Sequence, residues 1–205
     1  HIFYNIFLIK MYSHSEISFS YPIARGSPTL ILLVASPFLL GDQISNLNNI
    51  GALILTSGIF FLIFSEGNYK KINFKGLGLS LMVACTIVVY TLVDAQGARL
   101  SDSVFSYGIY MFAMEGIIFN LAYMLFFKDK KIPLKFILSE KYKILFACFL
   151  ITFAYLPILY AFTKVNVPSV AALREISILF TSIYGVYFLK EKFGLIKVIS
   201  AALVV

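Results

Sequence analysis

The sequence has few charged residues, only two cysteines and only two histidines. Charged side chains make up 13% of the 205 residues and hydrophobic ones 60%, whereas about a quarter of a soluble domain is charged. This composition excludes a disordered chain and an ordinary cytosolic enzyme. Cys85 and Cys148 lie inside apolar blocks, and His1 and His14 are too peripheral for metal ligation. We therefore expect neither a disulfide scaffold nor a metal site.

The common enzyme motifs are missing as well. The chain contains no His-rich metal spacing, no GxSxG elbow, no Walker loop and no aspartate-rich diphosphate motif. We therefore expect the protein not to be an enzyme and to bind no cofactor.

The sequence does contain apolar blocks of about twenty residues, the length that crosses roughly 30 Å of hydrocarbon. The blocks are long and do not alternate with period two, which favours helices over barrel strands. We predict an all-α membrane protein, a multi-pass helical bundle, in which Pro22, Pro28, Pro37 and Pro157 break or kink the helices. The predicted spans are residues 1–9, 17–40, 49–64, 76–93, 105–127, 142–162, 167–189 and 194–205. The first and last are predicted to be parts of longer spans, so the chain is interpreted as a fragment.

The net charge of +7 is concentrated in the loops between these spans. Only 3 of the 17 basic residues are Arg, and 12 of the 14 Lys fall in three loops. Such loop charge orients membrane proteins beside anionic lipid, so we expect a lipid bilayer and no nucleic acid as partner. The positive-inside rule places the lysine-rich loops in the cytoplasm. These loops are residues 10–16, 66–75, 128–143 and 190–197, and the opposite set is 42–48, 94–103 and 163–166.

Two segments 149 residues apart resemble each other. Sliding the chain by this distance superposes Arg25 on Arg174 and Asp42 on Glu191. Each Arg lies early in a span, and each acid follows 17 residues later, where it is expected to close the helix in a structural turn. The two spans are five apart, an odd number, so the repeats are inverted, as in many secondary transporters. We predict two inverted five-helix repeats, with the end of a truncated first repeat at residues 1–67 and the second at 76–205.

A family resemblance is carried by the segment SYPIARGSPTLILLVASPFLLGDQISNLNNIGALILTSG. It resembles the last two helices of the EamA domain in the drug/metabolite transporter superfamily, where a Leu-Gly-acid turn is followed by Gly nine residues after the acid. Here these positions are Leu40, Gly41, Asp42 and Gly51.

The second copy of this pattern is VPSVAALREISILFTSIYGVYFLKEKFGLIKVISAALVV. It keeps Glu191 but has Lys190 and Ser200 where the pattern has Gly. The stretches YPIARGSP and YTLVDAQGARLS are similar to one branch of the superfamily, which includes phosphonate-utilisation-associated membrane proteins.

The resemblance implies ten helices in two inverted repeats that move small metabolites by alternating access. We therefore expect a secondary transporter, for export or import, of a small polar or anionic metabolite, amino-acid-like or phosphonate-like. Its expected location is a bacterial cytoplasmic membrane, and its expected partner is a small-molecule substrate, with a homodimer left open. The alternative is a non-transporting membrane scaffold or lipid-handling subunit. The usual family topology, with both termini cytoplasmic, places the lysine-rich loops outside, opposite to the charge count.

Arginines deep in a span are candidate site residues, because each costs several kcal/mol in lipid without a cavity or partner. Arg25 lies about 12 Å deep at 1.5 Å per residue, and Arg174 is similarly deep from the opposite leaflet. Together with Tyr21 on the Arg25 face, and with Tyr90 and Tyr155, they are the candidate contacts for a carboxylate or phosphonate. The alternative is that each Arg pairs with an acid and holds the repeats together.

Glu115 is the deepest acid and lies near the middle of its predicted span, with Tyr107 near its face. One hypothesis is that Glu115 contacts substrate and exchanges a proton, coupling transport to a proton gradient. The other is that it forms a salt bridge with Arg25 or Arg174.

Asp94 is the second candidate coupling residue. It lies close to the end of the predicted span 76–93, so we favour an interfacial cap or a partner for Arg99.

Overall fold

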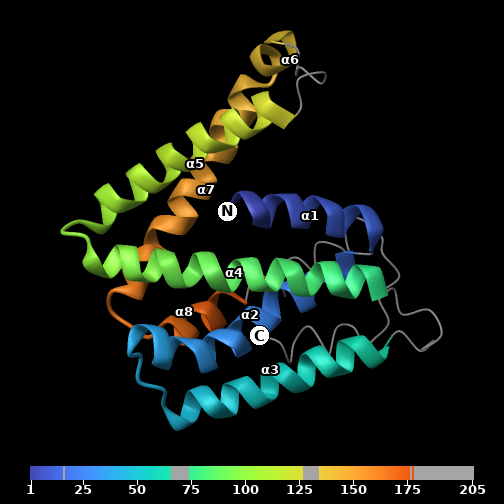
Figure 1. The fold of residues 1–205 in the computed structure, drawn as a ribbon, viewed down its shortest axis with the longest axis vertical. Coiled ribbons are helices and arrows are strands. Elements are labelled where there is room, and N and C mark those ends of the chain that lie inside the picture. The colour runs from blue at the N-terminus through green and yellow to red at the C-terminus, as the bar shows by residue number, and fades with distance from the viewer. Residues whose placement is uncertain (16, 66–73, 127–133, 176, 178–205) are drawn as a thin grey trace. The chain divides into compact units, whose positions relative to one another are not determined.

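The computed structural model describes residues 1–15, 17–65, 74–126, 134–175 and 177. Every regular element in those ranges is an α-helix (Figure 1). The helices are α1 (Ile2–His14), α2 (Ile17–Leu40), α3 (Asn46–Ser65), α4 (Phe74–Leu100), α5 (Val104–Phe126), α6 (Leu134–Ser139), α7 (Lys141–Phe162) and α8 (Val167–Arg174).

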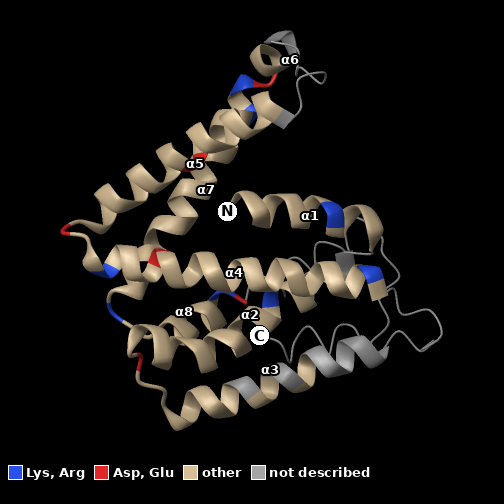
Figure 2. Cartoon of the chain, in the orientation of Figure 1, with Lys and Arg blue, Asp and Glu red and all other residues tan. Residues whose placement is uncertain are grey.

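Four of the described helices are long and apolar enough to cross a membrane. They are α2 over Ile23–Leu40, α4 over Phe74–Leu100, α5 over Val104–Leu125 and α7 over Lys141–Phe162. Figure 2 shows that these helices are uncharged over most of their length. The predicted class, an all-α multi-pass membrane protein, is therefore confirmed.

Several predicted boundaries need correction. The helix predicted to end at Val93 continues to Leu100, and the one predicted to end at Ile9 continues to His14. The short helix α6 lies where a loop was predicted. The prolines do not break their helices: α2 and α7 are each continuous through theirs. The span 194–205 and most of 167–189 fall outside the described residues.

The chain divides into two compact units. Unit 1 contains His1 and residues 3–93 and 165–205, and unit 2 contains Ile2 and residues 94–164. Helix α4 contributes to both, because the division falls between Val93 and Asp94. Unit 1 thus combines segments from both predicted repeats.

The core of unit 1 is formed by α1, α2 and α4. Met11, Ala24, Val83 and Ile87 are buried against one another. Helix α2 also contacts α3 and α8. Small and medium side chains at these positions allow the helices to approach closely, as is usual in membrane bundles.

A hydrogen-bonded junction joins the α2–α3 turn to the start of α8. Gly41 ends α2 with a φ of 70°, a conformation that glycine adopts without strain. Asp42 Oδ2 then accepts a 2.8 Å bond from the backbone N–H of Val167, a favourable place for a negative charge at a helix N-terminus. The Asn166 amide donates to the Gln43 carbonyl at 3.1 Å. Asp42 therefore caps α8, a helix remote in sequence, whereas it was predicted to close its own helix in a structural turn.

The same junction fixes the start of α3. Ser45 Oγ accepts from the N–H of Asn48, and Asn48 Oδ1 accepts in return from the N–H of Ser45. This reciprocal pair is a capping box. The Asn48 amide also donates to Ser169 Oγ on α8 at 2.7 Å, so one side chain caps α3 and ties it to α8.

Unit 2 is built on α5 and α7, which pack against each other. Gly108 on α5 lies at this contact, and a Cβ there would lie 2.5 Å from Leu156 Cδ2, so the Leu156 side chain would have to shift. Leu159 and Phe162 of α7 are fully buried. Most other large side chains of α5 and α7 are exposed and apolar, as lipid-facing residues are.

Candidate functional site

Arg25 lies in the first half of α2, within the segment that can cross a membrane. Its guanidinium carbon is 5.8 Å from the centroid of the Tyr21 ring, one turn earlier on the same helix. This geometry is that of a cation–π contact. The Nε atom of Arg25 is buried and has no hydrogen-bond partner among the described residues. The guanidinium therefore keeps a donor that a ligand could use.

Two further tyrosines surround the Arg25 guanidinium. Tyr4 from α1 and Tyr90 from α4 both lie close enough to interact with it electrostatically. The rings of Tyr4 and Tyr90 pack edge to face with their centroids 5.7 Å apart. The Tyr90 ring packs in the same way against the His1 ring, with centroids 4.4 Å apart. Side chains from three helices thus enclose one buried cation.

The end of α8 brings a second Arg and an acid to the same place. Glu175 is only 5% exposed and interacts electrostatically with both Arg25 and Arg174. Arg174 also interacts electrostatically with Tyr4, as Arg25 does. We call these six residues the Arg25 cluster: Tyr4, Tyr21, Arg25, Tyr90, Arg174 and Glu175.

The Arg25 cluster has the chemistry of an anion site. Two guanidiniums and one carboxylate leave one positive charge when all are ionised. Guanidinium donors suit planar or tetrahedral oxyanions, and tyrosine rings and hydroxyls suit the rest of a small polar molecule. Glu175 Oε2 is buried and without a hydrogen-bond partner in the described part of the chain. The cluster thus presents a free acceptor beside a free donor.

A second polar cluster lies in unit 2 around Asp94. This carboxylate is 4% exposed. The Tyr155 hydroxyl donates to Oδ2 at 2.6 Å, and the Tyr107 hydroxyl donates to Oδ1 at 3.3 Å. Asp94 lies inside α4 and is buried, because the helix continues past its predicted end at Val93 to Leu100. Arg99, the partner suggested for it, donates from Nε to the Phe162 carbonyl at 2.8 Å.

The predicted site residues therefore fall into two groups. The structure brings Tyr21, Arg25, Tyr90 and Arg174 together in unit 1, and Asp94 and Tyr155 together in unit 2. Glu115 lies on α5 in unit 2 and is half-buried.

Sequence analysis missed two members of the Arg25 cluster and one ligand of Asp94. Glu175 was not among the predicted site residues, although its place directly after Arg174 in the sequence was a signal. Tyr107 was placed near Glu115, but its hydroxyl bonds to Asp94 on the preceding helix. Tyr4 had no local signal, because its contact with Arg25 depends on the packing of α1.

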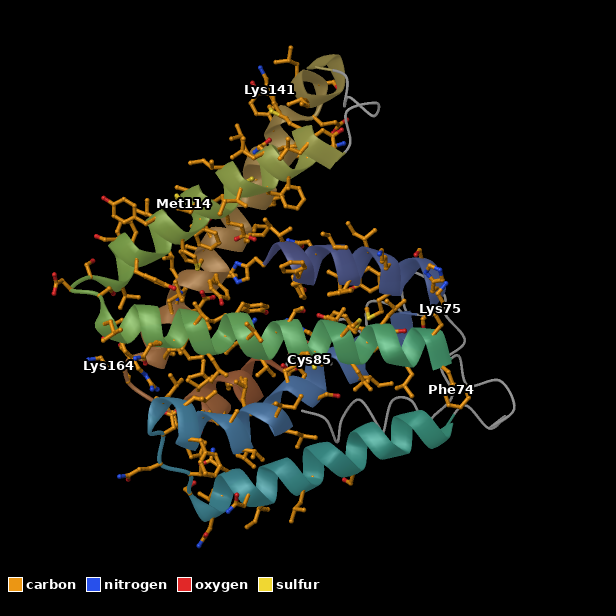
Figure 3. The ribbon with its side chains drawn as sticks, in the orientation of Figure 1. Phe74, Lys75, Cys85, Met114, Lys141 and Lys164 are labelled. Atoms are coloured by element: carbon orange, nitrogen blue, oxygen red, sulfur yellow. The ribbon has the colours of Figure 1, made fainter. Side chains whose placement is uncertain are left out.

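Among the described residues, no group of three or more His, Cys, Asp or Glu could hold a metal ion. Both cysteines, Cys85 and Cys148, are free and exposed. Figure 3 shows Cys85 on α4, the helix that carries Tyr90 and Asp94.

The model of the EamA-like transporter family matches residues 74–205. No curated protein and no solved structure matches the chain.

Proposed function

The chain belongs to the EamA-like transporter family, and from that membership we propose that it moves a small polar or anionic metabolite by alternating access. It is a multi-pass membrane protein of the drug/metabolite transporter type, a group of transporters rather than enzymes. The substrate class we propose is amino-acid-like or phosphonate-like, and the membrane we propose is the bacterial cytoplasmic one.

The observation that carries this proposal is the buried, incompletely bonded guanidinium of Arg25. A charged side chain inside a membrane is expensive and usually marks a substrate or ion path. Packing alone would favour partners for every donor, because a buried donor without one is unfavourable. A carboxylate or phosphonate bound in the Arg25 cluster would supply the missing acceptor.

The repeat organisation supports placing the site between the two repeats. Residues 1–67 are proposed to be the end of one inverted repeat and 76–205 the other. Arg25 and Arg174 occupy equivalent positions in them and act on the same residues, Tyr4 and Glu175. Inverted-repeat transporters hold their substrate at such an interface, near the bilayer midplane.

For coupling, we propose that Glu115 or Asp94 exchanges a proton during the transport cycle. Both are carboxylates on membrane-crossing helices, and carboxylates in such places commonly relay protons. Each carboxylate oxygen of Asp94 accepts a hydrogen bond from a tyrosine hydroxyl, from Tyr155 and from Tyr107.

A non-transporting scaffold is the second candidate, and one observation favours it. Glu175 lies beside both Arg25 and Arg174, so the three charges could serve only to hold helices together. In that case, replacing Arg25 would lower stability and leave no specific effect on flux.

The test uses the full-length protein in proteoliposomes and compares Arg25→Ala with Lys10→Ala. Lys10 is exposed on α1, so replacing it removes one positive charge without changing the Arg25 cluster. We expect Arg25→Ala to abolish flux while its folding, insertion and thermal stability stay close to wild type. A variant with normal flux would refute the binding role of Arg25. Absence of flux from the folded wild-type protein, together with a loss of stability in Arg25→Ala, would favour the scaffold.

A further inference from the structure

The buried face of α2 carries hydroxyl groups that have no hydrogen-bond partner. Thr29 and Ser36 are 5% and 0% exposed. Their side-chain oxygens have no partner in the part of the chain that the structure describes. Arg25, Thr29, Leu32 and Ser36 are spaced i, i+4, i+7 and i+11, so they lie on one stripe of the helix. Thr91 on α4, next to Tyr90, has the same property.

Other hydroxyl groups in the same structure are satisfied by their own helices. Ser80 donates to the Gly76 carbonyl at 2.9 Å, and Thr86 donates to the Val83 carbonyl at 2.7 Å. Such back-bonding is the usual way in which Ser and Thr satisfy a hydroxyl inside a helix. Thr29, Ser36 and Thr91 differ from Ser80 and Thr86, because their hydroxyl groups do not bond to a carbonyl of their own helix.

Buried polar groups are rarely left without partners, and in hydrocarbon the penalty is several kcal/mol for each group. A transiently bound partner, such as water or a polar solute, would satisfy these hydroxyl groups. From Arg25 to Ser36 the stripe covers about 16 Å at 1.5 Å per residue. That is half of a hydrocarbon core of about 30 Å, and the stripe runs toward Gly41, just beyond the end of the candidate span Ile23–Leu40.

We infer that this stripe of α2 is a hydrophilic path along which water and the polar substrate pass between the Arg25 cluster and the face at Gly41. Passage of substrate along this path rests on the proposed transport function. Passage of water does not depend on it. Leu32, fully buried between the two hydroxyls, interrupts the path with an apolar side chain. Alternating access requires such a closed point in one of its states.

The test is accessibility of single cysteines in the full-length protein. Every native cysteine, including Cys85 and Cys148, is replaced by Ala, and single cysteines are placed at Thr29 and Ser36. The matched controls at similar depth are Ile31→Cys and Val34→Cys, whose side chains are exposed on α2. The probe is a charged, membrane-impermeant methanethiosulfonate added to proteoliposomes.

We expect the path cysteines to react about tenfold or more faster than the controls, because only a hydrated thiol ionises readily. Equal, slow reaction at all four positions would overturn the proposal. Fast reaction without flux of any solute would keep the path and refute the transport function. Flux without fast reaction of the path cysteines would keep the transport function and refute the path.

A second comparison does not depend on thiol chemistry. Ser36→Ala and Ser80→Ala remove hydroxyls of equal burial, one without a partner and one bonded to Gly76. We expect Ser36→Ala to slow flux and Ser80→Ala to leave it near wild type. Equal effects of the two changes would contradict the path.

Discussion

Gly97→Ala tests whether α4 and α5 are packed as closely as the structure shows. A Cβ on Gly97 would lie 2.5 Å from the Tyr107 hydroxyl oxygen, whereas real Cβ atoms essentially never come within 3.0 Å of another heavy atom. The ring must move, and its hydrogen bond to Asp94 is lost with it. We therefore expect one added methyl group to disturb both the packing of α4 on α5 and the hydrogen bonding of the buried Asp94 carboxylate.

The expected loss of stability is about 1.5–3.5 kcal/mol. Overpacking costs about 1–3 kcal/mol, and a hydrogen bond to a charged group is worth about 1.5 kcal/mol when long. The better helix propensity of Ala returns about 1 kcal/mol. The measurement is the midpoint of thermal unfolding of the purified protein in detergent.

Gly78→Ala is the matched control on the same helix. Nothing lies within 4 Å of a Cβ built there, so this change should leave the unfolding midpoint unchanged or raise it. Adding Tyr107→Leu to Gly97→Ala should recover part of the lost stability, since the ring is then gone. Equal midpoints for Gly97→Ala and Gly78→Ala would refute the reasoning.

Three further predictions concern the polar contacts. Tyr155→Phe should lower stability by about 1.5–3 kcal/mol, since it removes the 2.6 Å bond to the buried Asp94; an unchanged unfolding midpoint would count against that bond. Asp42→Ala should cost about 1–2 kcal/mol, because the N–H of Val167 loses its acceptor, and Asp42→Asn should retain part of it. Glu115→Gln should make flux independent of an imposed proton gradient if Glu115 is the coupling group, and retained dependence would point to Asp94.

Hydropathy located the helices well but failed where polar residues continue a helix. The segment 94–100 is polar at Asp94, Gln96 and Arg99, so it was predicted to be a loop. In the structure it remains helical, because Asp94 is bonded by two tyrosines and Arg99 by a carbonyl of α7. These partners lie on other helices, and their positions cannot be obtained from a hydropathy profile.

Members of the Arg25 cluster could be predicted only where they are close in sequence or related by the internal repeat. The contact of Tyr21 with Arg25 follows from a spacing of four residues on one helix. Arg174 could be identified because the internal repeat superposes it on Arg25. Tyr4 and Glu175 come to Arg25 through the packing of α1 and α8 on α2, which no spacing along the chain predicts.

The most direct test of the central claim is solute flux by the full-length protein in proteoliposomes. A panel of labelled amino acids, amines and phosphonates is measured with and without an imposed proton gradient. We expect saturable flux of at least one solute that carries a carboxylate or phosphonate, and competition by unlabelled analogues with the same group. No flux of any solute, from protein shown to be folded and inserted, would contradict it.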